Sequence, residues 1–147
     1  MEIERRVTLP ASCERVFELV GDLARYPQWM DLIHDVIEVE SVAGEPRAWE
    51  VELRAQVGPL ARSKRLRMAR TVHDVPRVAV FERSEVDGRQ HSPWVLQSRL
   101  EPVTDGTELV MTLTYGGGLW TGAVLQRVLD DHVERGASAL LALLSDQ

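Results

Sequence analysis

The chain lacks several features that mark large functional classes. Its 147 residues include one cysteine, Cys13, so no internal disulfide can form. Asp and Glu total 23 against 17 Lys and Arg, and this net charge of −6 argues against a protein that binds DNA or another polyanion. The longest apolar run, 139–144, is far shorter than the roughly 18 residues that a membrane span needs. We therefore expect no DNA partner and no membrane span.

Further absences point to the compartment and to the kind of site. Residues 1–5 contain no apolar signal core, which together with the lone cysteine favours a reducing cytoplasm. No repeat, linker or low-complexity tract interrupts the chain, so we expect one domain over residues 1–147. The histidines lack metal-ligand spacing, and we expect neither a metal nor a cofactor. These histidines are His34, His73, His91 and His132.

Periodicity predicts the order of the secondary structure elements. Alternating residues indicate a strand over 2–9, and Ser12 can then cap a short helix. A second short helix that includes Trp29 is expected after the break at Tyr26-Pro27. Apolar residues next recur with period 2, which predicts strands near 36–43, 48–57, 63–75, 78–87, 92–103 and 107–116. A long amphipathic helix is expected over 119–147.

The apolar face of this last helix is interrupted. Its predicted members are Leu125, Val128, Leu129, His132, Val133, Gly136, Ala139, Leu140 and Leu143. Gly136 and His132 fall near the centre of the face, although mid-helix glycine costs roughly 1 kcal/mol relative to alanine and a buried imidazole needs hydrogen-bond partners. A small residue beside a polar one therefore predicts a cavity at Gly136.

Short turns between the strands predict an antiparallel meander that buries one face under the final helix. Alternation over 48–57 and 107–116 identifies that face. Its predicted residues are Trp49, Val51, Leu53, Ala55, Val57, Leu109, Met111, Leu113 and Tyr115. The fold class is therefore α+β.

Three motifs near the beginning of the chain carry a family resemblance. They are Leu9-Pro10-Ala11, Val16-Phe17-Glu18-Leu19-Val20 and Asp22-Leu23-Ala24-Arg25-Tyr26-Pro27-Gln28-Trp29. With the element order, they resemble the START-like (SRPBCC, helix-grip) superfamily, and within it the polyketide cyclase/dehydratase-like branch. The resemblance implies a curved antiparallel sheet of about seven strands around a long C-terminal helix. It also implies two short helices after the first strand and an elongated apolar cavity, entered near them.

Arg70 is the first candidate for a polar site in that cavity. Alternation over 66–72 places it on the face of Leu66, Met68 and Val72. A buried guanidinium keeps its charge and needs a carboxylate, carbonyl or enolate partner. In the aromatase/cyclase branch, a similarly placed arginine orients the polyketide and stabilises an enolate, so the resemblance implies a ligand-binding or catalytic Arg70. The alternatives are a β-bulge that turns Arg70 outward, or an ion pair with Glu82 or Glu85.

Histidine is the second candidate. His132 or His34 can act as an acid or base near neutral pH, although the branch's tyrosine at the start of the second strand is replaced here by His34-Asp35-Val36-Ile37. A core His132 bonded to a strand side chain or water is the alternative. The full set of predicted ligand-binding residues is Trp49, Leu53, Met68, Arg70, Trp94, Met111, Tyr115, Leu129, His132 and Gly136.

Other features have simpler interpretations. Cys13 is more often a packed bystander than a nucleophile at such a position, and 116–118 is expected to be a hinge. The basic cluster of Arg62, Lys64, Arg65 and Arg67 suits either a solvated strand edge or an anionic partner such as a carrier protein, membrane surface or ribosomal RNA.

The sequence predicts a protein that binds a small hydrophobic or aromatic ligand, of lipid or polyketide type, between sheet and helix. One alternative is a polyketide cyclase, aromatase or dehydratase with Arg70 and His132 as catalytic residues. Another is an interaction protein resembling the ribosome-associated toxin and quinone-binding chaperone branch. The patterns carry no signal for an oligomeric state.

Overall fold

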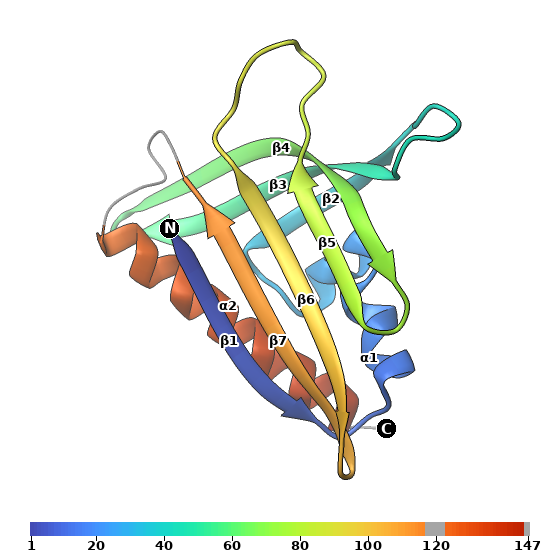
Figure 1. Cartoon of the computed structure of the whole chain (residues 1–147). Helices are drawn as coiled ribbons and strands as arrows, with labels where there is room; N and C mark the ends of the chain where they lie inside the picture. The colour runs from blue at the N-terminus through green and yellow to red at the C-terminus, as the bar shows by residue number, and fades with distance from the viewer. Residues whose placement is uncertain (117–122, 146–147) are drawn as a thin grey trace.

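A computed structural model describes residues 1–116 and 123–145 (Figure 1). In these residues the sheet has seven strands, with two short helices after the first strand and one long helix at the end. The elements are β1 (Glu2–Leu9), α1 (Cys13–Val20), η1 (Leu23–Gln28), β2 (Ile33–Val39), β3 (Ala48–Val57), β4 (Leu60–Asp74), β5 (Val78–Arg83), β6 (Trp94–Val103), β7 (Gly106–Tyr115) and α2 (Ala123–Ser145).

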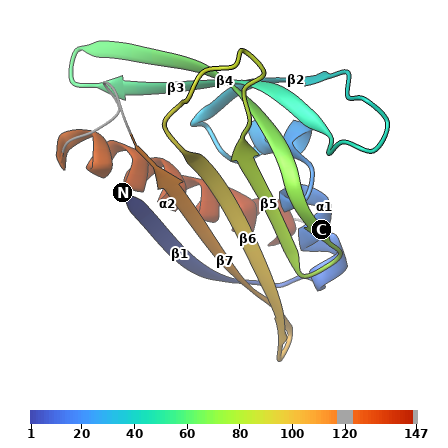
Figure 2. The ribbon, with the colours of Figure 1, turned by 45° about the horizontal axis from the view of Figure 1, so that its top comes forward.

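The sheet is an open antiparallel meander in which the first strand is added at one edge, beside the last strand. The strand order is β1-β7-β6-β5-β4-β3-β2, and every neighbouring pair is antiparallel. The sheet bends around α2, which lies along its concave side, while α1 and η1 lie at one end of the sheet (Figure 1, Figure 2). This arrangement confirms the α+β helix-grip fold expected from the sequence.

The first short helix begins at the predicted cap, whereas the second lies earlier in the chain than predicted. Ser12 caps α1 by accepting a hydrogen bond from the Arg15 backbone N–H at 3.3 Å. Asp22 caps η1 in the same way, at the Ala24 N–H. The expected helix after Tyr26-Pro27 is therefore wrong in position, because η1 starts before this break and Trp29 is only its C-terminal cap.

The strands agree with the predicted ones in number and differ at their ends. β2 starts at Ile33 rather than near 36 and ends at Val39, while 40–47 form an exposed loop. β5 ends at Arg83 rather than near 87, because its pairing with β6 runs out at Glu82↔Val95. The alternating pattern continues past the ends of β2 and β5, where the chain has no hydrogen-bonded partner strand, so the predicted strands are too long there.

The long helix buries a stripe that is rotated around the helix relative to the projected one. Its buried residues are Leu125, Leu129, His132, Val133, Gly136, Ala137, Leu140 and Leu144. The projection omitted Ala137 and Leu144, which are buried on one side of this stripe. Val128, Ala139 and Leu143 are only half-buried. The predicted helical residues 119–122 and 146–147, and the hinge residues 117–118, lie outside the described residues.

The concave side of the sheet forms the core, as alternation predicted. Trp49, Leu109, Met111 and Tyr115 are all at most 1% exposed, and only Val57 of the predicted inner residues is half-buried. Among the described helices, none is both long and apolar enough to cross a membrane.

Candidate functional site

A small apolar cavity lies in the core, bounded by the sheet, α2 and the segment that joins η1 to β2. Its volume is about 30 Å³, which leaves room for about two water molecules. All twelve lining residues are apolar: Leu23, Met30, Leu32, Ile33, Val51, Leu53, Leu66, Met68, Trp94, Leu96, Leu113 and Val133. A site with no polar lining favours an apolar molecule over water.

The strand part of this lining follows from alternation. β3 and β4 contribute neighbouring pairs that point inward, with Leu66 directly opposite Val51 in the register. A further part of the wall comes from Met30, Leu32 and Ile33, which lie where the chain passes from η1 into β2. The sequence analysis missed these three residues because they lie between the short helix expected at Trp29 and the strand expected near 36, where no periodic pattern was assigned.

Three of the ten predicted ligand-binding residues line the cavity: Leu53, Met68 and Trp94. Trp49, Met111, Tyr115 and Leu129 are buried but do not border it. Trp49 instead packs edge-on against Phe81, with ring centroids 5.6 Å apart. A period of 2 identifies the buried face of a strand and does not tell how far along that face a cavity lies.

The predicted cavity at Gly136 is wrong, because other side chains fill that space. A Cβ atom at position 136 would lie 3.0 Å from Met30 Cε, 3.1 Å from Met30 Sδ and 3.5 Å from Trp29 Cε3. Gly136 thus lets the segment between η1 and β2 approach α2 closely. Met30 lies between Gly136 and the cavity that it lines.

His132 does not line the cavity either, and it ties α2 to the same segment. Its Nδ1 atom lies 2.5 Å from Asp31 Oδ1, and Arg135 Nε donates to Asp31 Oδ2 at 3.2 Å. Burial raises the pKa of the Asp31 carboxyl, but the hydrogen bonds and charges of His132 and Arg135 lower it more, so the net pKa is below its usual value. The alternative of a core histidine had named a strand side chain or water as its partner, but the partner is the carboxylate of Asp31, in the segment between η1 and β2.

Arg70 is half-buried on the inward face of β4 and lies outside the cavity lining. Its Nη1 donates to the Gly21 carbonyl at 3.0 Å, and its guanidinium carbon lies 5.8 Å from the centroid of the Trp49 ring. A register shift follows Arg70 and leaves Val72 exposed, so the bulge ends the inward row without turning Arg70 outward. Within the described residues, no ion pair joins Arg70 to Glu82 or Glu85.

Arg70 borders a second, open cleft between α1, η1 and β4. The cleft has a volume of about 530 Å³ and is also bordered by Arg47 and His73. Burial and the charges of Arg70 and Arg47 lower the pKa of His73. Arg47 is held by Glu38 through two hydrogen bonds of 2.7 and 2.8 Å.

The remaining candidates are separated from the cavity. His34 is exposed at the bulge in β2, and buried Cys13 lies 3.4 Å from Thr107 Oγ1. The basic residues of β4 do not form one patch. Arg62 and Lys64 pair with inward-facing residues of β3, whereas Arg65 and Arg67 occupy the opposite face.

Comparison with known proteins identifies the family. Residues 1–145 match the family described as polyketide cyclase / dehydrase and lipid transport, so the chain belongs to that family. No curated protein sequence matches the chain at a significant level.

Solved structures share the fold at low sequence identity. A START superfamily protein from Mycobacterium smegmatis is 18% identical to this chain and superposes with a TM-score of 0.76. The match covers 99% of this chain and 97% of the Mycobacterium smegmatis chain. The Zhui aromatase/cyclase from Streptomyces sp. R1128 is 17% identical with a TM-score of 0.68, covering 99% of this chain and 93% of its own. The di-domain ARO/CYC StfQ from the steffimycin biosynthetic pathway is 13% identical with a TM-score of 0.70, over 99% of this chain and 50% of its own. The fold is that of START and polyketide cyclase-like ligand-binding proteins.

Proposed function

We propose that this protein binds a small hydrophobic or aromatic molecule, of lipid or polyketide type, in the cavity between the sheet and α2. The observation that carries the proposal is the lining of this cavity, in which all twelve residues are apolar. Such a lining stabilises an apolar ligand by excluding it from water, at about 25 cal/mol per Å² of apolar surface buried. Membership of the family supports the same conclusion.

The ligand must widen the cavity when it binds. The 30 Å³ seen here is roughly a tenth of the volume of ordinary small-molecule sites. Met30 and Met68 border the cavity, and methionine side chains are unbranched and adapt readily to new packing. Met30 also belongs to the short segment over α2, so its displacement is the simplest way to open the site.

Truncation of Met68 tests the proposal, with Met111 as the matched control. Both side chains are buried in the sheet, but only Met68 borders the cavity. Each Met→Ala change should cost about 2–5 kcal/mol of stability. Met68→Ala should strengthen binding of the uncharged dye N-phenylnaphthylamine severalfold, measured by fluorescence titration, whereas Met111→Ala should leave it unchanged. Equal effects of the two substitutions, or no binding by the wild type and by Met68→Ala, would contradict the proposal.

The cyclase alternative requires Arg70 and His132 to reach the ligand. Neither lines the cavity, and each already contacts the protein, Arg70 at the Gly21 carbonyl and His132 at Asp31. No specific observation favours catalysis, and the basic residues that suggested an interaction protein are divided between two faces. Ligand binding is therefore the function that the geometry supports best.

A further inference from the structure

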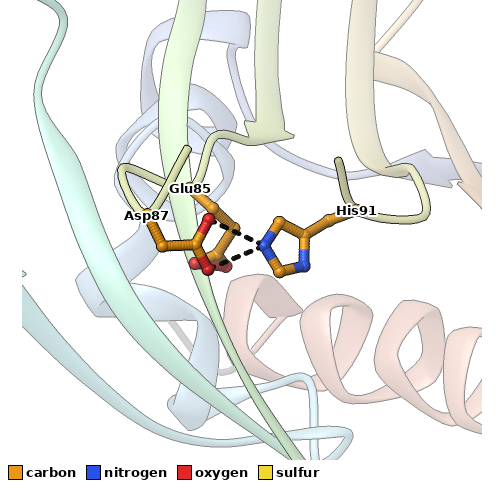
Figure 3. Close-up of side chains that lie close together, drawn as sticks. All are labelled: Glu85, Asp87 and His91. Atoms are coloured by element: carbon orange, nitrogen blue, oxygen red, sulfur yellow. Dashed lines mark hydrogen bonds and ion pairs between the residues drawn. The ribbon is translucent and has the colours of Figure 1, made fainter. Parts of the chain in front are cut away.

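The loop between β5 and β6 brings three potential metal ligands together, and none of them lines the cavity. Glu85, Asp87 and His91 each offer one ligating atom, and these atoms all lie within 4.8 Å of one another. Figure 3 shows the imidazole of His91 facing both carboxylate oxygens of Asp87, with Glu85 beside Asp87. The sequence analysis considered histidine only with other histidines and Cys13, and so did not group His91 with carboxylates.

Two of the three side chains are held in place by groups outside the cluster. Glu85 Oε1 accepts hydrogen bonds from the Arg67 backbone N–H at 2.8 Å and from Arg83 Nε at 3.2 Å. Asp87 Oδ1 accepts from the Arg89 backbone N–H at 3.0 Å, across a turn in which Gly88 has a φ of +74°. Ligands that are already oriented by neighbouring donors lose little freedom when a metal binds.

The distances between Asp87 and His91 are close to those between two ligands of one metal ion. His91 Nε2 lies 3.0 and 2.9 Å from the two oxygens of Asp87. Zinc bonds of about 2.0–2.2 Å at tetrahedral angles require ligand atoms roughly 3.3 Å apart. Asp87 and His91 are exposed, so their side chains can open by a few tenths of an ångström.

We propose that Glu85, Asp87 and His91 form a binding site for a divalent transition-metal ion of the zinc class. An imidazole nitrogen with two carboxylate oxygens suits Zn²⁺, whereas Mg²⁺ and Ca²⁺ take oxygen ligands alone. Two carboxylates and a neutral imidazole balance the charge of the ion. The adjacent Arg83 reduces affinity, and three protein ligands leave a fourth position for water.

A bound ion would fasten the β5–β6 loop at its outer end. The base of the loop is already fastened, because Arg83 Nη1 donates to the Ser92 carbonyl at 3.3 Å. The metal would join residues 85–91 across the loop. Only residues 92–93 separate His91 from the cavity-lining Trp94, at which β6 begins. The site thus acts as a clamp on this loop.

Zinc titration of the tag-free, chelator-washed protein by calorimetry tests the proposal. We expect one Zn²⁺ per chain, and Asp87→Asn and His91→Ala should each weaken binding about tenfold or more. His34→Ala, which removes another exposed histidine, should bind as the wild type does. Co²⁺ should give visible absorption bands in the wild type that both loop variants lose.

The outcomes decide the proposal without reference to the apolar ligand. The absence of zinc binding, or binding that survives both Asp87→Asn and His91→Ala, would show that Asp87 and His91 form an ion pair only. Both variants lie on the exposed loop, and unchanged melting temperatures without metal would confirm that their folds are intact.

Discussion

At the scale of single residues, Gly136 determines how closely the chain packs over α2. The space that a side chain would occupy there holds the thioether of Met30 and the ring edge of Trp29. The same methionine then forms part of the cavity wall. One missing side chain on the helix thereby places a flexible residue between α2 and the ligand site.

Substitutions at Gly136 should therefore depend steeply on size. Gly136→Ala gains about 1 kcal/mol of helix propensity and needs only a small shift of the Met30 terminus, so its unfolding free energy should stay within about 1 kcal/mol of wild type. Gly136→Leu has no such space and should lose about 1–3 kcal/mol through overpacking. Denaturant unfolding measures both. Ser138→Leu, on the exposed side of α2, should be nearly neutral, and an equally neutral Gly136→Leu would mean that the space over Gly136 is not filled.

At the scale of elements, the contact between α2 and the η1–β2 segment includes an ion pair. The carboxylate of Asp31 contacts His132 and Arg135, which lie three residues apart on one side of α2. The adjacent residues Met30 and Leu32 are apolar and line the cavity. This segment therefore forms part of the cavity wall, and the polar contact of Asp31 holds it against α2.

The lowered pKa of Asp31 predicts how this contact responds to pH. A carboxyl whose pKa is lower in the folded state stabilises the fold above its unfolded pKa of about 4, and this contribution is lost as the pH falls through the folded value. The stability difference between wild type and Asp31→Asn should be largest near pH 7 and should shrink below about pH 4. Chemical denaturation at several pH values measures it. Asp131→Asn, at an exposed position of α2, should show no comparable difference at pH 7, and a constant deficit for Asp31→Asn would contradict the ionic role.

The elements also show what periodicity can predict. Alternation in β3 and β7 identified the buried face, because the pleat fixes the direction of each side chain. It did not find the wall at 30–33, because these residues follow η1 without a helix or a full strand of their own. Nor did the projection of α2 reveal that Met30 fills the space at Gly136, since that contact joins residues about a hundred positions apart. Long-range contacts of this kind are invisible to a local pattern.

At the scale of the whole molecule, the curved sheet and α2 enclose a core that contains a small apolar cavity, and every residue lining this cavity is buried. The lining comes from elements at both ends of the chain, from η1 to α2, so a ligand there would contact most of the fold at once. Binding would accordingly stabilise the folded state against global unfolding, and this stabilisation would grow with the logarithm of ligand concentration once that concentration exceeds the dissociation constant.

The methionine methyl groups provide the most direct measurement of ligand position. The chain has four methionines; Met30 and Met68 line the cavity, whereas Met1 and Met111 do not. With methyl-labelled methionine, titration with N-phenylnaphthylamine should shift the NMR signals of Met30 and Met68 and leave those of Met1 and Met111 in place. Shifts confined to Met1, or equal shifts of Met111 and Met68, would contradict binding in the cavity between the sheet and α2.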